Sequence, residues 1–341
     1  MKENNAEQMQ QHLDNLTKPV GSLGDLEDFA MKLSLVQGRI PPKVEKKISV
    51  VFAGDHGIAE EGVSLYPKEV TAQMVLNFLS GGAAINVLSR HCGFDNWVVD
   101  AGVASDTSGD GLLDMKVGRG TKNFAREEAM TGDELLLCLE RGRTLAARIA
   151  DDGYDLVSVG DMGIANTTTA AALLAANGLS LDDVVDRGTG IDDETLRHKR
   201  GVIEAALDKH GPFDDVYASM RCLGGFEICM ICGLILGLKD KKVACVVDGF
   251  PVTAGAFLAW TIDNEVSDFL FAGHKSKVKG HIVTLQKMGL KPIVDLNMRL
   301  GEGTGAVLGG FLVALGAKIA CEMASFASAG VSRSETDEEN Y

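Results

Sequence analysis

Positive charge is scarce in this sequence. Of the 341 residues, 33 are Lys or Arg and 48 are Asp or Glu, so the formal net charge is −15. Nucleic acids and anionic membranes are bound by clustered Lys and Arg, so this charge balance argues against both as partners. A small anionic substrate is not excluded, because it responds only to the charge of its own site.

Long apolar runs and a paired set of cysteines are also missing. The longest apolar stretches, 228–238 and 306–320, contain Gly and are too short to span a bilayer. Residues 1–16 are polar and lack the apolar segment of a signal peptide. The seven Cys are an odd number in a chain too large to depend on disulfides, which favours a reduced, cytoplasmic location.

No familiar metal-binding spacing is present. Cys222, Cys229 and Cys232 include a Cys-x-x-Cys, but no second Cys pair or His cluster completes a tetrahedral set. We therefore predict buried structural cysteines, no metal and no cofactor. His56, in Gly-Asp-His-Gly, is predicted to be a turn residue near a site rather than a metal ligand.

The sequence does contain a repeated pattern of a short apolar run, a Gly/Asp turn and a helical stretch. The apolar runs and the Asp that follows each are Ile48–Ala53 with Asp55, Trp97–Val99 with Asp100, Leu156–Val159 with Asp161, Val243–Val247 with Asp248, and Leu290–Val294 with Asp295. Continuously apolar strands that alternate with helices indicate an α/β fold with a doubly wound, mostly parallel, Rossmann-like sheet. Ligands in such folds bind at the carboxyl ends of the strands, so these Asp residues mark a candidate rim. The alternative is that each caps a helix or shapes a turn.

The two chain ends lack strands. Segments 7–16, 23–37 and 308–327 read as helices. We predict that residues 1–40 and 305–330 form a small helical subdomain beside a Rossmann-like α/β domain of residues 41–304. Residues 331–341 are predicted to be an acidic, disordered tail.

The segment from Gly160 has the chemistry of a phosphate-binding loop. It reads Gly160-Asp-Met-Gly-Ile-Ala-Asn-Thr167 and leads into an Ala-rich helix that Asn166 or Thr167 could cap. Small residues, backbone N–H groups, hydroxyls and a helix N-terminus suit a phosphate. The segment matches neither the Walker A nor the dinucleotide-binding pattern, and its alternative interpretation is an ordinary capped helix.

A second glycine-rich segment, Arg299-Leu-Gly-Glu-Gly-Thr-Gly-Ala306, surrounds a carboxylate. Gly on both sides of Glu302 lets a ligand approach the backbone closely. We predict Glu302 to be a general base that the nearby helix N-terminus keeps ionised. The alternative is a mobile turn with an exposed Glu.

Lys199 belongs to a charged helical segment that Asp192 or Asp193 could cap. A charged helical segment usually forms a solvated surface, so Lys199 matters only if the fold turns it toward the substrate.

Together these segments resemble the nicotinate-nucleotide–dimethylbenzimidazole phosphoribosyltransferases of cobalamin biosynthesis, from about Lys18 to Ala327. The loop with which common phosphoribosyltransferases hold pyrophosphate is absent, so the donor must carry another leaving group. The matching segments are Lys18-Pro-Val-Gly-Ser-Leu-Gly24, Val51-Phe-Ala-Gly-Asp-His-Gly57, Gly62-Val-Ser-Leu-Tyr-Pro67, Val70-Thr-Ala-Gln-Met74, Gly81-Gly-Ala-Ala-Ile-Asn86, Gly163-Ile-Ala-Asn-Thr-Thr168, Gly188-Thr-Gly190, Gly224-Gly-Phe-Glu-Ile228, Asp248-Gly-Phe250 and the Glu302 segment.

The resemblance implies a reaction and its residues. Nicotinate mononucleotide gives its phosphoribosyl group to 5,6-dimethylbenzimidazole with inversion at C1′, and the products are α-ribazole 5′-phosphate and nicotinate. It also implies a homodimer. The implied catalytic residues are Glu302 and Asp161. The implied phosphate and donor residues are Gly163, Ile164, Asn166, Thr167, Gly188, Lys199, Arg299, Leu300 and Gly301, and the implied acceptor residues are Ser64, Tyr66, Gln73 and Asp248.

This chain departs from the family pattern at two positions. Asp161 and Ala165 stand where the family usually has Glu and Gly. Asp161 is one methylene shorter, which bears on the geometry at the acceptor. A first alternative is therefore the same transfer to adenine or a phenolic base. A second is a non-catalytic nucleotide-binding subunit of the same fold, for which loss of Glu302 would be the expected mark.

Overall fold

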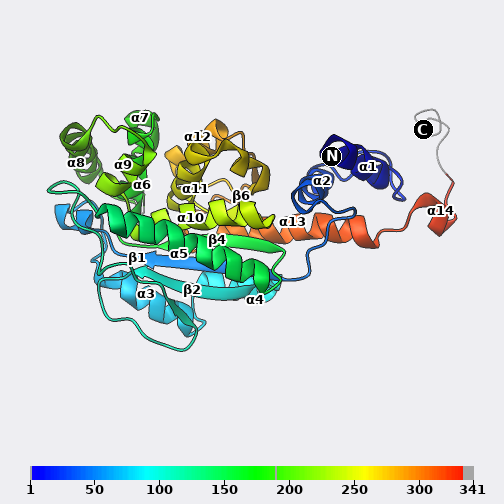
Figure 1. The fold of residues 1–341 in the computed structure, drawn as a ribbon, viewed down its shortest axis with the longest axis horizontal. Helices are drawn as coiled ribbons and strands as arrows, with labels where there is room; N and C mark the ends of the chain where they lie inside the picture. Colours follow the sequence, from blue (N-terminus) through cyan, green and yellow to red (C-terminus); the bar gives the residue numbers. More distant parts are fainter. Residues whose placement is uncertain (1, 189, 333–341) are drawn as a thin grey trace.

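The protein is built around one parallel sheet that helices cover on both faces. A computed structural model describes residues 2–188 and 190–332 (Figure 1). The sheet has seven strands in the order β3-β2-β1-β4-β5-β6-β7, and every pairing is parallel. The strands are β1 (Lys47–Gly54), β2 (Asp95–Gly102), β3 (Leu112–Asp114), β4 (Leu156–Met162), β5 (Ala244–Val247), β6 (Leu270–His274) and β7 (Pro292–Val294). The predicted α/β class with a doubly wound parallel sheet is confirmed.

Alternation along β1 explains why helices cover both faces of the sheet. Val50 and Phe52 join a core cluster with α5 (Gly132–Asp151), α6 (Asn166–Ala176), α10 (Phe226–Lys241) and α11 (Phe250–Ile262). Val51 and Ala53 point to the other face, where the core includes α3 (Glu69–Leu79), α4 (Ala84–Cys92) and α13 (Thr304–Glu322). Both sets of side chains are apolar, as expected for a strand buried on both sides.

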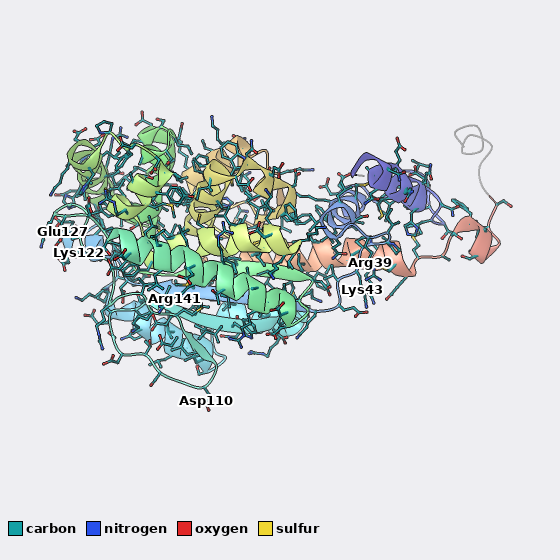
Figure 2. All side chains as sticks on the ribbon, in the orientation of Figure 1. Arg39, Lys43, Asp110, Lys122, Glu127 and Arg141 are labelled. Carbon is teal, nitrogen blue, oxygen red and sulfur yellow. The ribbon has the colours of Figure 1, made fainter. Side chains whose placement is uncertain are left out.

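The remaining helices complete these layers. They are α1 (Lys2–Asp14), α2 (Asp25–Gln37), η1 (Gly57–Glu61), α7 (Leu181–Val184), α8 (Asp193–His210), α9 (Val216–Leu223), η2 (Asn264–Phe269), α12 (Lys279–Lys287) and α14 (Phe326–Ala329). Charged side chains lie on the outer surface, with Arg39 and Lys43 toward the end that carries α1 and α2 and the Lys122–Glu127 ion pair toward the opposite end (Figure 2).

The two chain ends pack together. Met9, Leu13 and Leu16 share a small core with Ala30 of α2 and Ala320 near the end of α13. In Figure 1, α13 runs from the sheet to this helical end. Its first half also packs against β4, β5 and β6, so the predicted boundary at residue 305 falls within a helix that serves both regions. The division into two domains stays a prediction, and residues 333–341 of the predicted tail lie outside the described residues.

Two segments are long and apolar enough to cross a membrane, judged by length and composition alone. They are Glu69–Cys92, which contains two separate helices, and Thr304–Glu322, which is α13. In α13, 61% of the apolar stretch is buried inside the protein. In this structure α13 is therefore a core helix that covers one face of the sheet.

Candidate active site

The strand order reverses between β1 and β4, and the polar residues gather around that point. β2 and β3 lie on one side of β1, whereas β5, β6 and β7 follow on the other side of β4. A ligand crevice opens at such a reversal, outside the carboxyl ends of the strands. Asp161 lies in β4 opposite Phe52 of β1, and Asp248 follows directly after β5.

The loop Gly163–Thr167, called here the phosphate loop, connects β4 to α6. Ala165 is the N-cap residue and has a left-handed backbone with φ 72. The predicted cap by Asn166 or Thr167 is therefore wrong, because the chain enters the helix one residue earlier and no described side chain caps its first turn. The positive end of α6 thus carries no side-chain cap, although the N–H groups of Asn166 and Thr168 donate to the carbonyls of Gly163 and Ala165.

Lys199 of α8 points into the protein and reaches this loop. Its side chain is 2% exposed, and its Nζ donates to Thr167 Oγ1 at 2.9 Å and to the Asp186 carbonyl at 3.3 Å. Burial lowers the pKa of Lys199 to about 8, so most of the ammonium stays charged at neutral pH. The solvated-surface interpretation is wrong for Lys199, although it describes its exposed neighbour Arg200. The predicted cap by Asp192 is confirmed by its bond to the Thr195 N–H at 2.8 Å.

A hollow joins the predicted donor residues to part of the predicted acceptor segment. Its lining comprises Val63, Ser64, Tyr66, Gly163, Ile164, Ala165, Asn166, Thr167, Arg187, Ile191 and Lys199. Gly188 lies against it, because a Cβ there would be 3.1 Å from Thr167 Oγ1. Gln73 lies on α3 with its side chain exposed. Sequence reasoning missed Arg187, although its place before Gly188 in a predicted donor loop was a usable signal.

The loop of residues 299–305, which carries the predicted base Glu302 and is called here the base loop, has an unusual backbone. Gly301, Glu302 and Gly303 have φ values of 87, 63 and 93. Glycine adopts this left-handed conformation freely, whereas Glu302 holds it at a cost of roughly 1–2 kcal/mol. A non-glycine residue in this region needs support from its surroundings and is common at functional sites.

Asp248 supplies that support. Its two carboxylate oxygens accept from the N–H groups of Gly303 at 3.0 Å and Ala306 at 2.9 Å, and the residue is 0% exposed. His281 fixes the Asp248 backbone: its Nδ1 accepts from the Ser276 N–H, so its Nε2–H donates to the Asp248 carbonyl at 3.0 Å. Burial lowers the pKa of His281 to about 3, which keeps the ring neutral. Asp248 therefore holds the base loop, and its contact with an acceptor stays a prediction.

The Glu302 carboxylate is buried but incompletely hydrogen-bonded. The residue is 8% exposed, and its Oε2 has no hydrogen-bond partner among the described residues. Burial raises the pKa of Glu302, the Asp248 charge raises it further, and a hydrogen bond from the Ile85 N–H opposes both. The lowering of this pKa comes from an N–H at the start of α4 rather than from the helix that follows Glu302, and burial outweighs it. A raised pKa makes the carboxylate a stronger base near neutral pH.

The base loop and β4 are in direct contact. A Cβ on Gly160 would lie 2.4 Å from the carbonyl carbon of Glu302, so only glycine fits there. Arg299 extends toward the donor side, since a Cβ on Gly190 would be 3.9 Å from its Nη1. Leu300 is 58% exposed. The two glycine-rich segments, far apart in the sequence, are thus in contact at Gly160 and Glu302.

Asp161 lies beneath the phosphate loop. It is 4% exposed, and its Oδ2 accepts from Asn166 Nδ2 at 2.6 Å. Burial and the Glu227 charge raise the pKa of Asp161 to about 7, although the Asn166 bond opposes this. Within residues 2–188 and 190–332, no group of His, Cys, Asp and Glu is arranged to hold a metal ion. The seven cysteines are free thiols, and Cys222, Cys229 and Cys232 are buried as predicted.

The chain is similar in sequence and fold to known phosphoribosyltransferases. A family model described as "Phosphoribosyltransferase" matches residues 1–331. The nicotinate-nucleotide–dimethylbenzimidazole phosphoribosyltransferase of Geobacter sulfurreducens is 50% identical over 333 residues, covering 96% of this chain and 94% of the relative. The protein of the same name from Geobacter sp. (strain M21) is 49% identical over 327 residues, covering 95% and 94%.

A solved structure agrees with this relationship. The crystal structure of CobT from Thermus thermophilus is 45% identical, with a TM-score of 0.93 over 97% of this chain and 100% of that chain. A sequence identity of 45–50% over at least 94% of each chain is far higher than proteins that share only a fold need to have. This chain belongs to the nicotinate-nucleotide–dimethylbenzimidazole phosphoribosyltransferase family.

Proposed function

We propose that this protein transfers the phosphoribosyl group of nicotinate mononucleotide to 5,6-dimethylbenzimidazole. Inversion at C1′ gives α-ribazole 5′-phosphate and nicotinate, which is the lower-ligand step of cobalamin biosynthesis. The observation that carries the proposal is Glu302: a buried carboxylate with one unpartnered oxygen, on a loop that touches the strand leading to the phosphate loop.

The donor phosphate binds at the N-terminus of α6. The backbone of Gly163 and Ile164, the Asn166 and Thr167 side chains and the Lys199 ammonium surround that position. Gly188, Arg299, Leu300 and Gly301 complete the donor side. A helix N-terminus and a nearby ammonium both favour an anion, so they hold the phosphate while the ribose extends toward the base loop.

The chemical step needs a leaving group, a nucleophile and a base. Nicotinate on C1′ is a cationic pyridinium and leaves as a neutral ring, with an oxocarbenium-like transition state as in other glycosyl cleavages. One benzimidazole nitrogen attacks the opposite face of C1′ while the other loses its proton to Glu302. Proton transfer to a positioned carboxylate contributes about 10²–10⁴-fold. Ser64, Tyr66 and Gln73 line the acceptor side, and Asp161 supports the site through Asn166.

The direct test is product formation. Purified protein is mixed with nicotinate mononucleotide and a panel of bases without added metal, and ribotides are separated by chromatography. We expect α-ribazole 5′-phosphate from dimethylbenzimidazole. Failure to form ribotide from any base would refute the proposal.

A second acceptor class is motivated by Asp161. Its carboxylate is shorter than the Glu usual in the family and is engaged by Asn166 at 2.6 Å, so it extends less far into the acceptor side. Adenine and phenol therefore belong in the panel. Product from these bases but not from benzimidazoles would identify a different lower ligand. An unchanged acceptor profile in Asp161→Glu would show that the departure is neutral.

We also propose a cytoplasmic homodimer with a small helical subdomain built from both chain ends. Leu76, Val87 and Phe311 are each at least 44% exposed on α3, α4 and α13, the helices that cover one face of the sheet. An apolar surface of this kind is suited to a second copy. Light scattering coupled to size exclusion should give twice the chain mass.

A further inference from the structure

Two sequence motifs with no role in the reaction above meet beneath the phosphate loop. His56 belongs to Gly54-Asp-His-Gly57 after β1, and Glu227 belongs to Gly224-Gly-Phe-Glu227 at the start of α10. The His56 Nε2 and Glu227 Oε1 atoms are 2.8 Å apart, and both side chains are 0% exposed. Burying an ionic group costs free energy unless a group of opposite charge lies close to it. His56 and Glu227 supply that partner to each other.

Glycine at nearby positions lets the backbone close around the pair. A Cβ on Gly163, the first residue of the phosphate loop, would lie 2.9 Å from His56 Nε2 and 2.4 Å from the Gly54 carbonyl. A Cβ on Gly225 would lie 2.5 Å from His56 Cε1. Contacts under 3 Å leave no room for a side chain, so the loop backbone rests directly on the imidazole ring.

The opposite nitrogen of the ring is tied to the helix that follows the loop. His56 Nδ1 lies 2.9 Å from Thr169 Oγ1, within the first turn of α6. His56 therefore contacts the first residue of the loop, Gly163, and Thr169 in the helix turn that follows the loop. Its ring spans the two ends of the segment that presents N–H groups to a phosphate.

The charges around His56 favour its protonated form. Glu227 faces it from α10, Asp161 from β4 and Asp55 from the same turn. Burial by itself lowers the pKa of His56, but these carboxylates, Glu227 foremost, raise it overall. A protonated ring can only donate, so its Nε2 pairs with the Glu227 carboxylate and its Nδ1 faces the Thr169 hydroxyl.

We propose that His56 and Glu227 are a positioning pair that fixes the backbone of the phosphate loop and so sets the affinity for the donor's 5′-phosphate. This inference rests on the proposed function. Neither side chain reaches the ligand, so both act through the backbone of the loop. The ligand group whose binding this pair supports is a phosphate monoester.

The test compares donors with and without the phosphate. We expect His56→Gln and Glu227→Gln to raise the KM for nicotinate mononucleotide by roughly tenfold or more, with a smaller change in kcat. The kcat/KM for nicotinate riboside, which lacks the phosphate, should stay within about twofold. Loss of activity toward both donors in equal proportion, or an unchanged KM for the nucleotide, would overturn the inference.

Milder variants guard against misfolding. Thr169→Val removes only the hydroxyl that contacts His56, and we expect it to raise the nucleotide KM about threefold. Thr284→Val is the matched control, because Thr284 is also buried and its hydroxyl donates to the Gly280 carbonyl of its own helix. The inference fails if the two variants behave alike.

Calorimetry with inorganic phosphate separates this inference from the proposed reaction. The unmodified protein should bind phosphate more tightly than either Gln variant even if no ribotide forms with any base. Equal affinities would reject the positioning pair, whatever the outcome of the product assay.

Discussion

The base loop and the phosphate loop lie at the same edge of the sheet but are built for opposite purposes. In the base loop, Asp248 pairs the backbone N–H groups and leaves a carboxylate oxygen of Glu302 without a partner. In the phosphate loop, Asn166 and Thr167 have partners for their side chains, and the helix N-terminus carries no cap. One loop leaves a buried carboxylate oxygen without a described partner, and the other carries the positive end of a helix without a side-chain cap.

This difference indicates which loop should govern the catalytic rate and which should govern the affinity for the donor. In the proposed mechanism, the catalytic rate depends on the unpartnered carboxylate, whose raised pKa suits proton removal. The affinity for the donor there depends on the phosphate loop and a buried cation, which act equally in the ground state and the transition state. Substitutions in the base loop should therefore lower kcat, whereas substitutions at the phosphate loop should raise KM.

The largest effect is expected from Glu302→Gln. The amide cannot take a proton but keeps an oxygen for the Ile85 N–H, so we expect kcat to fall about 10²-fold or more while donor binding is largely kept. Steady-state kinetics with both substrates checks the split. Full turnover in this variant would show that Glu302 is not the base.

The pH dependence of the activity tests the same role of Glu302 as the base. Only ionised Glu302 accepts a proton, so activity falls as the pH drops through the pKa of the folded protein. Burial raises that pKa, so the acid limb should lie above the ordinary range of a glutamate. Glu302→Gln should lack the limb in its residual activity, and a limb unchanged in position would assign it to another group.

Asp248→Asn should have the next largest effect. The amide NH₂ would face a backbone N–H and cannot accept from both Gly303 and Ala306, so the base loop loses one anchor. We expect kcat to fall about 10–10²-fold with a smaller change in donor KM. Asp295→Asn is the control, because this exposed residue pairs with Lys275 and the Asn297 backbone on the surface. A larger effect on KM than on kcat would break the proposed division between the loops.

The sequence was sufficient for the parallel α/β class and for five of the seven strands, but it did not indicate β3 or β6. Apolar runs of four to six residues that end at Gly and Asp are a strong local signal, and β1, β4 and β5 form where that signal stands. The left-handed N-cap at Ala165, the burial of Lys199 and the support from Asp248 were not predictable. Each depends on a contact between segments more than 30 residues apart or on a backbone angle that side-chain type does not determine.

Lys199→Met should act on affinity. Met fills a similar volume without charge, so the donor KM should rise about tenfold while kcat changes less. Arg200→Met is a matched control at the adjacent position, where the side chain is 38% exposed and pairs with Asp182 and Glu204. Exposed pairs contribute little, so the control should keep its KM. Equal shifts in both variants would mean that general surface charge, rather than a local ammonium, holds the donor.

The smallest effect concerns the backbone of the phosphate loop. Ala165 has φ 72, which disfavours any residue with a Cβ, so Ala165→Gly relieves strain at the cost of a small buried methyl group and a more flexible unfolded chain. We expect the free energy of unfolding to rise by up to about 1 kcal/mol in urea titrations. Ala171→Gly, in the interior of the same helix, should instead lower it by about 1 kcal/mol. Opposite signs at two alanines of one helix would locate the strain at the loop, and losses of equal size would show that the loop stores none.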